Sequence, residues 1–219
     1  QMSEASNKTE RPRVRRLPKR GHYDRETIDA ILDEGLVAHL AFADETGQPY
    51  AIPTLHARDG DRIWIHGSSA SRTLRAVGAG VPVCLTVTLV DGLVLARSIF
   101  NHSMNYRSVV VLGTARPVED EDEKRAALEA FAERIAPGRW ADARPPTRQE
   151  LKATSILSLP LEEASAKIRT GPPGDEGEDL ELDVWAGVIP FETRRGAPIP
   201  APNLRPGIEL PAYLADSPS

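Results

Sequence analysis

The sequence contains very little cysteine and no long apolar run. Cys84 is the only cysteine among 219 residues, so no intrachain disulfide can form and nothing suggests an oxidising compartment. No apolar run approaches the roughly 20 residues of a membrane-spanning helix, and we expect neither a signal peptide nor a membrane partner. These absences predict a cytoplasmic protein.

Aromatic residues are also scarce. They make up 5% of the chain, whereas hydrophobic residues in total make up 40%, so the core must consist mostly of Val, Leu, Ile and Ala. Such residues suit a sheet with packed helices, and the length of the chain suits one domain. The formal net charge of −5 gives no reason to expect nucleic acid as a partner.

The two ends of the chain differ in composition from the middle. Residues 1–20 contain seven Lys or Arg and two Glu, a net charge of +5, and we predict a flexible basic arm there. Binding of this arm to nucleic acid or to an acidic membrane is the alternative. Residues 196–219 are rich in proline, which argues against a helix or an inner strand, so we predict an extended tail. Residues 21–195 remain as one globular domain.

Alternating apolar and polar residues predict a mainly β protein with peripheral helices. Turn-forming dipeptides, among them Asp91-Gly92, separate the strands as hairpins. The predicted strands are residues 36–42, 50–57, 62–66, 83–89, 93–99, 106–115, 155–161 and 164–170. The predicted helices are residues 24–34, 71–80 and 120–135. Many strands punctuated by tight turns favour a small antiparallel barrel.

A segment rich in hydroxyl groups lies between the predicted strand 62–66 and the helix that follows it. It reads Gly67-Ser68-Ser69-Ala70-Ser71-Arg72. Unpaired N–H groups at a helix N-terminus attract anions, and an Arg guanidinium adds a charge-assisted contact, so the segment predicts a phosphate site. In the alternative interpretation, Ser71 only caps the helix and Arg72 is a solvated surface residue.

A second polar segment, Asn105-Tyr106-Arg107-Ser108, opens the predicted strand 106–115. The two-residue period of a strand places Asn105 and Arg107 on one face, and we favour this pair as the one that meets a ligand. The alternative is a turn followed by a strand with a surface Arg.

The five histidines, at positions 22, 39, 56, 66 and 102, show no spacing typical of metal ligands, so we expect no metal site. His66 lies at a strand end beside the hydroxyl-rich segment, and it is our candidate catalytic residue because it is best placed to face a substrate. A purely structural role for His66 is the alternative. No Ser–His–acid order or paired-carboxylate motif stands out, which gives little support to a hydrolase.

Several short segments, taken together, resemble one family. They are residues 20–24, 52–53, 66–72, 93–98, 105–109, 171–173 and 185–187. Their combination resembles the pyridoxamine 5'-phosphate oxidase-like FMN-binding split-barrel superfamily, and within it the branch of nitroimidazole-reductase-like flavoproteins. The likeness extends over residues 16–200, and each segment alone is a weak signal.

The resemblance implies a split β-barrel that forms a homodimer, with FMN held non-covalently in two sites at the interface. By position, Ser69, Ser71 and Arg72 would hold the FMN phosphate. Trp185 is a candidate to stack on the flavin ring or to seal the partner's pocket, or else it is an ordinary aromatic residue of the interface. The other implied cofactor-binding residues are Pro53, Thr54, Leu55, Asn105 and Arg107.

The function implied by the resemblance is that of an FMN-dependent oxidoreductase acting on a small-molecule substrate, with reduced nicotinamide as one candidate electron donor. Flavin chemistry needs no cluster of charged catalytic residues, because the ring itself accepts or donates hydride. Two alternatives stay open: a flavin- or haem-binding carrier or sensor without turnover, and a deazaflavin-dependent reductase.

Overall fold

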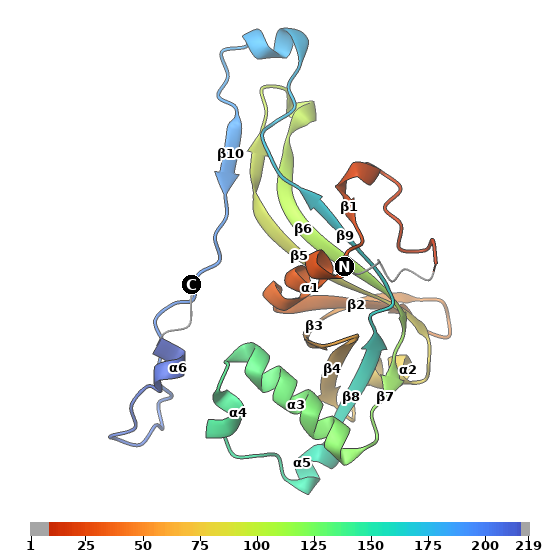
Figure 1. The fold of residues 1–219 in the computed structure, drawn as a ribbon, viewed down its shortest axis with the longest axis vertical. Helices are drawn as coiled ribbons and strands as arrows, with labels where there is room; N and C mark the ends of the chain where they lie inside the picture. The colour runs from red at the N-terminus through yellow and green to blue at the C-terminus, as the bar shows by residue number, and fades with distance from the viewer. Residues whose placement is uncertain (1–8, 216–219) are drawn as a thin grey trace, which may run out of the picture.

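The computed structural model describes residues 9–215, which form one connected antiparallel sheet flanked by helices (Figure 1). The strands follow the order β1-β9-β6-β5-β2-β3-β4-β8-β7, and β10 pairs with β5 off this path. The predicted mainly β architecture with peripheral helices is therefore confirmed. The strands are β1 Gly21–His22, β2 Val37–Ala43, β3 Pro49–Asp59, β4 Arg62–Ser68, β5 Pro82–Leu95, β6 Ser103–Thr114, β7 Arg116–Pro117, β8 Thr154–Pro160, β9 Glu163–Arg169 and β10 Gly187–Pro190.

The helices begin where side chains cap them. Asp24 accepts a hydrogen bond from the Thr27 N–H at 2.8 Å before α1, and Ser71 accepts one from the Leu74 N–H at 3.3 Å before α2. Such caps satisfy N–H groups that have no partner inside the helix. The α-helices are α1 Arg25–Glu34, α2 Arg72–Gly78, α3 Glu121–Ile135, α4 Arg139–Asp142, α5 Arg148–Ala153 and α6 Ala212–Ala215. The 3-10 helices are η1 Pro18–Arg20, η2 Ile99–Asn101 and η3 Gly177–Glu181.

Two apolar clusters hold the sheet and helices together. The larger cluster contains the buried face of α1 and the inward side chains of β2, β5 and β6. The smaller one joins α3 to β3, β4 and β8, with Phe131 packed in the same cluster as Trp64 and Ile156. Because successive strand residues face opposite sides, β4 contributes Ile63 and Ile65 to the first cluster and Trp64 to the second.

The predicted hairpin turn at Asp91-Gly92 is wrong. One long strand, β5, runs through this dipeptide and pairs with β6 on both sides of it, with a register shift between Val90 and Gly92. The turn instead lies at residues 96–102, so β5 and β6 form a long arm that projects from the barrel (Figure 1). Turn propensity is local, and here the strand pairing along both edges of β5 overrides it.

The C-terminal segment leaves the arm and returns to the helices. After β10 it has no regular structure until α6, a short helix within the stretch 196–219 that the proline content predicts to be extended. Residues 216–219 lie outside the described residues. At its end, the hydroxyl of Tyr213 donates to the Asp142 carboxylate at 2.6 Å, and Arg139 donates to the same hydroxyl at 3.1 Å. These contacts attach the segment to α4.

The basic N-terminal segment contacts the sheet over its described part. Arg11 forms an ion pair with Glu163 of β9 at 3.1 Å, and the Val14 N–H donates to the Tyr23 hydroxyl at 2.9 Å. The first eight residues of the arm predicted at 1–20 lie outside the described residues.

Candidate functional site

Two adjoining cavities open where β3, β4 and α2 meet, with volumes of about 570 Å3 and about 140 Å3. Ile52 and Thr73 line both cavities, so the two form one groove. We call it the β3–α2 groove. Its smaller end is lined by Pro53, Thr54, Ser68 and Ser71, and its larger end by Arg72 and Arg75.

The backbone of β3 has a free edge at this groove. Residues 56–59 of β3 pair with β4, but residues 49–55 pair with β2 alone. Within the described chain, the N–H and C=O groups on the other edge of residues 52–55 therefore have no strand partner. This stretch of backbone is half-buried or exposed, so a polar ligand with donors and acceptors along one edge can form hydrogen bonds with it.

The loop that closes the smaller end is held in one conformation. The Ser69 N–H donates to the Ala153 carbonyl at 3.0 Å, and the Ala70 N–H donates to the Ser68 hydroxyl at 3.2 Å. A Cβ atom at Gly67 would lie 2.7 Å from a terminal methyl group of Leu74, so the absence of a side chain there lets Leu74 of α2 pack closely on β4. The hydroxyl of Ser71 is thereby held at the start of α2, beside the groove.

The structure brings together four of the residues predicted to bind the cofactor, namely Pro53, Thr54, Ser71 and Arg72. Leu55 and Ser69 are neighbours of these residues in the chain but do not line the groove. Sequence reasoning missed Ser68, Thr73 and Arg75, which do line it. The signal was present, because the hydroxyl-rich segment already contains Ser68, and Arg75 lies one helical turn after Arg72.

Charge is distributed unevenly along the groove. Arg72 and Arg75 are exposed, and neither side chain forms an ion pair or hydrogen bond with any residue between 9 and 215. Asp44, at the same end, accepts hydrogen bonds from the hydroxyl and the N–H of Thr46, and the hydroxyl contact in particular lowers the pKa of Asp44. The two guanidinium groups therefore remain available to an anionic ligand.

His66 lines the smaller end of the β3–α2 groove, and its ring also lies against a helix. Its ring stacks on Phe131 of α3 with a centroid separation of 4.2 Å, on the same face of β4 as Trp64. Its Nδ1 atom is buried and has no hydrogen-bond partner among the described residues. The catalytic role of His66 stays a prediction, and this packing agrees with the structural alternative stated above.

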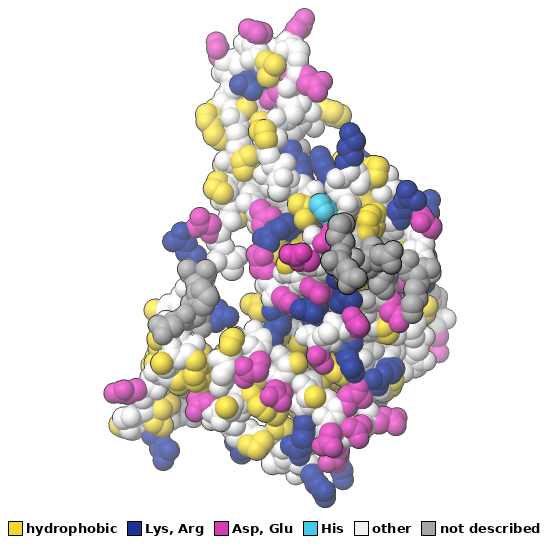
Figure 2. Space-filling model, viewed as in Figure 1, with side chains coloured by type: hydrophobic (Ala, Val, Ile, Leu, Met, Phe, Trp, Pro, Cys, Tyr) yellow, Lys and Arg dark blue, Asp and Glu magenta, His cyan; other side chains and the backbone are white. Residues whose placement is uncertain are grey.

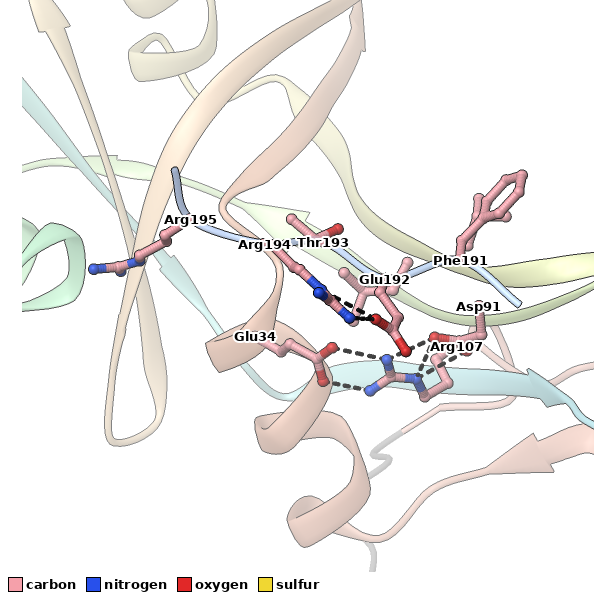
Figure 3. Close-up of a pocket in the computed structure, with 10 residues that line it drawn as sticks. Glu34, Asp91, Arg107, Phe191, Glu192, Thr193, Arg194 and Arg195 are labelled. Atoms are coloured by element: carbon pink, nitrogen blue, oxygen red, sulfur yellow. Dashed lines mark hydrogen bonds and ion pairs between the residues drawn. The ribbon is translucent and has the colours of Figure 1, made fainter. Parts of the chain in front are cut away.

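Arg107 lines a different cavity, of about 600 Å3, between the β5–β6 arm and the segment after β10 (Figure 3). Its guanidinium donates to Asp91 at 2.7 Å and to Glu34 at 2.8 Å, and these carboxylates raise the pKa of Arg107. Glu192 and Arg194 pair with each other on the opposite side of this cavity (Figure 3). The charge of Arg107 is thus already balanced by two carboxylates.

The structure does not bring Asn105 or Trp185 to the β3–α2 groove. Asn105 shares the inward face of β6 with Arg107, as predicted, and its amide is buried. It donates to the Gly171 carbonyl at 3.1 Å and accepts from Arg169. Trp185 is exposed and lies over Gly187 of β10. A cofactor role for these two residues stays a prediction.

The family of the chain follows from comparison with known proteins. Residues 24–168 match the family model described as pyridoxamine 5'-phosphate oxidase. The chain belongs to this family. The predicted superfamily and its split β-barrel are therefore confirmed. A search of the curated proteins finds no match.

Two solved structures are similar to this member of the pyridoxamine 5'-phosphate oxidase family over nearly its whole length. The flavocytochrome Anf3 from Azotobacter vinelandii is 41% identical, with a TM-score of 0.90, and the match covers 97% of this chain and 98% of that one. The FAD and haem binding protein from Mycobacterium smegmatis is 40% identical, with a TM-score of 0.86, covering 90% and 96%.

A third solved structure shares the fold with this family member. It is a putative 5-nitroimidazole antibiotic resistance protein from Bacteroides thetaiotaomicron, 20% identical, with a TM-score of 0.58. The match covers 68% of this chain and 86% of that one. At this identity the likeness shows the fold alone.

The described part of this family member contains neither a cluster of metal ligands nor a membrane-crossing helix. Between residues 9 and 215, no three or more His, Cys, Asp or Glu side chains group together in a way that could hold a metal ion. In the same part of the chain, no helix is both long and apolar enough to cross a membrane.

Burial raises the pKa of the Cys84 thiol, so this side chain stays protonated at neutral pH.

Proposed function

We propose that the protein is a flavin- and haem-binding oxidoreductase that holds its flavin in the β3–α2 groove. The observation that carries this proposal is the backbone edge of residues 52–55, which has no strand partner between residues 9 and 215. It lies in the same groove as the Ser71 hydroxyl and two arginines without an ion-pair partner in that part of the chain. Two relatives of about 40% identity, described as a flavocytochrome and as an FAD and haem binding protein, support the same pair of cofactors.

The residues of the groove suit the two chemical ends of a flavin nucleotide. The free edge of β3 offers N–H and C=O groups to the polar edge of an isoalloxazine ring. Ser71 and Arg72 offer a hydroxyl and a guanidinium to phosphate. A bound flavin accepts hydride, and a haem exchanges single electrons, while the protein binds, orients and excludes water.

The length of the groove favours FAD over the FMN that the family resemblance implies. The groove continues past Arg72 to Arg75 through its larger, 570 Å3 part. FMN ends at one phosphate, whereas FAD carries a diphosphate and an adenosine that need this additional space. The relative from Mycobacterium smegmatis is likewise described as binding FAD.

A homodimer is part of this proposal. The outward face of the sheet exposes large apolar side chains, including Val37, Leu55 and Val90 on three neighbouring strands. Figure 2 shows further exposed hydrophobic side chains over the β5–β6 arm and the C-terminal segment. Apolar surface of this extent is typical of a protein interface. Light scattering coupled to gel filtration tests the dimer, and a Val37→Glu variant should shift the mass toward that of a monomer.

Cofactor uptake is the experiment that tests the proposal. The cofactor-free protein is mixed separately with FAD, FMN and haemin, desalted, and its absorption spectrum recorded. We expect retention of FAD at about one per chain, weaker retention of FMN, and a Soret band with haemin. Loss of both flavins on desalting would contradict the proposal, and preferential binding of a deazaflavin would replace it by the reductase alternative.

Turnover is tested separately from binding. The loaded protein is mixed with reduced nicotinamide or another small-molecule donor without oxygen, and the visible absorption band of the flavin is followed. Bleaching of the flavin, followed by recovery on admission of oxygen, is expected of an oxidoreductase. A flavin that no donor reduces would favour a carrier or sensor.

A further inference from the structure

The tip of the β5–β6 arm, residues 96–102, is held rigidly by one buried carboxylate. Asp175 accepts hydrogen bonds from the Arg97 N–H at 2.6 Å and the Ser98 N–H at 3.2 Å, and its side chain is 1% exposed. Asn101 donates to the same carboxylate at 3.4 Å. A tip anchored at three points can present its side chains in a fixed arrangement.

His102 is one of the side chains that this tip presents. The ring is exposed, and its Nδ1 atom lies 3.0 Å from the Ser98 carbonyl oxygen. Because a carbonyl can only accept, Nδ1 carries the proton of the neutral ring and Nε2 carries the free lone pair. Within residues 9–215, Nε2 has no hydrogen-bond partner. An Nδ1–H donated to a carbonyl is the arrangement that orients metal-ligating imidazoles.

The residues beside His102 are apolar and exposed to an unusual degree. Ile99 is 87% exposed and Phe100 is 93% exposed, although both are large hydrophobic residues on a rigid turn. Met104, two residues after His102, is also exposed. A porphyrin offers flat apolar faces that such side chains can cover, and its own nitrogens supply the equatorial ligands of the iron, so one imidazole suffices to attach it to a protein.

The other histidines are less suited to bind an iron porphyrin. The ring of His56 is buried, with Nε2 hydrogen-bonded to a backbone carbonyl, and the ring of His66 is stacked on α3. His22 lies in the short strand β1, paired with β9. His39 is exposed on β2, but no hydrogen bond within the described residues fixes its tautomer. His102 alone among the five combines exposure with an oriented ring.

From this arrangement we infer that Nε2 of His102 is an axial ligand of haem iron and that Ile99 and Phe100 pack against the porphyrin. The inference rests on the proposed function, because it names the residue that holds the haem. It places the haem at the tip of the arm and the flavin in the β3–α2 groove, which are separate parts of the chain.

The ligand is tested by haemin titration of the full chain, comparing wild type with His102→Ala and with His39→Ala as the matched control. We expect His102→Ala to lose the wild-type ferric Soret and visible bands and to raise the haemin Kd roughly tenfold or more. His39→Ala should keep the wild-type spectrum. Added imidazole should restore the wild-type bands to His102→Ala, which a merely structural role of this side chain would not allow.

The apolar contacts are tested by Phe100→Ser. This change leaves the ligand in place, so the haemin Kd should rise while the position of the Soret band stays as in wild type. Ile99→Ser should behave in the same way. A changed band position in these variants would contradict the assignment of the two residues as packing contacts.

The outcomes separate the inference from the proposed function. If wild type takes up haemin and His102→Ala shows the same spectrum and affinity, the ligand assignment is overturned and the proposed function stands. If wild type takes up no haemin, the haem part of the proposed function fails together with the inference. Retention of FAD by His102→Ala shows that the variant is folded in either case.

Discussion

Gly92 of β5 and Ile189 of β10 approach so closely that a Cβ atom at position 92 would lie 2.7 Å from the Ile189 carbonyl oxygen. The Cα atom of Pro190 would lie 3.2 Å from the same Cβ. Both neighbours are backbone atoms of a paired strand and cannot rotate away. The absence of a side chain at Gly92 is therefore what allows β10 to pair with β5 at this point.

Replacing this glycine should loosen β10. We expect Gly92→Ala to lower the free energy of unfolding by about 1–3 kcal/mol, the usual cost of overpacking. Amide hydrogen exchange at residues 187–190 should become faster, because the strand must shift to make room. Gly174→Ala is the matched control, since a Cβ there meets nothing within 4 Å. Equal stability of the two variants would show that β10 tolerates a side chain at position 92.

The same glycine shows where sequence reasoning about the fold reaches its limit. The caps and the alternation of apolar residues are local signals, and they predicted α1 after Asp24 and the paired strands. Asp91-Gly92 is also a local signal, typical of a hairpin turn. Its glycine is instead required by β10, almost a hundred residues later in the chain. No local pattern contains that contact.

The candidate site was predictable to the extent that its residues are neighbours in the chain. Ser71 and Arg72 lie near Pro53 and Thr54 because β3 and β4 form one hairpin and α2 directly follows β4 in the chain. For Arg107, alternation gave the correct face of β6. Alternation could not predict that Arg107 pairs with Glu34 and Asp91, because these carboxylates belong to other elements. For the same reason it could not predict the separate cavity that these residues line.

Removal of the Arg72 guanidinium should weaken flavin binding. We expect Arg72→Ala to cost about 1.5–3 kcal/mol, or roughly 10- to 150-fold in Kd, the scale of a hydrogen bond to a charged group. Fluorescence titration of the cofactor-free protein with FAD measures the change. The loss should shrink at high salt, because this end of the groove is open to solvent.

An exposed arginine remote from the groove provides the control for that titration. Arg148 opens α5 and is exposed, so Arg148→Ala removes the same charge without touching the groove. Its FAD affinity should equal that of wild type. If Arg72→Ala binds FAD as tightly as Arg148→Ala does, Arg72 does not contact the flavin phosphates.

The anchor at Asp175 should make the tip of the arm sensitive to acid. Hydrogen bonds from backbone N–H groups, chiefly that of Arg97, lower the pKa of Asp175 below its ordinary value of 3.8. Because the pKa of Asp175 is lower in the fold than in the unfolded chain, the ionised carboxylate stabilises the fold at every pH above the ordinary value of 3.8. This stabilisation is lost as the pH falls through the lowered pKa of the folded state. Amide exchange at Arg97 and Ser98, corrected for intrinsic rates, should therefore accelerate in acid.

A neutral variant separates this effect from general acid unfolding. Asp175→Asn keeps the shape but removes the charge, so the two amides should exchange faster already at neutral pH. Asp183→Asn changes an exposed carboxylate in the same loop region and should leave them protected. Protection of Arg97 and Ser98 in Asp175→Asn equal to that of wild type would show that other contacts hold the tip.

His56 should make the whole fold less stable below neutral pH. Its ring is buried, Nε2 donates to the Leu32 carbonyl at 2.9 Å, and burial lowers the pKa of His56 below its ordinary value of 6.5. In the unfolded chain the ring takes up a proton near pH 6.5, whereas in the fold it stays neutral. The unfolded state therefore binds more protons, and the free energy of unfolding must decrease as the pH falls below this value.

Urea denaturation at about pH 8, 7, 6 and 5 measures this decrease. Wild type should lose stability over this range, and His56→Gln, whose amide can still donate to the Leu32 carbonyl, should lose less because it cannot titrate. His39→Gln removes an exposed histidine and should follow the wild-type curve. If His56→Gln also follows that curve, another group is responsible for the acid sensitivity, and the His56 ring must take up its proton as readily in the fold as in the unfolded chain.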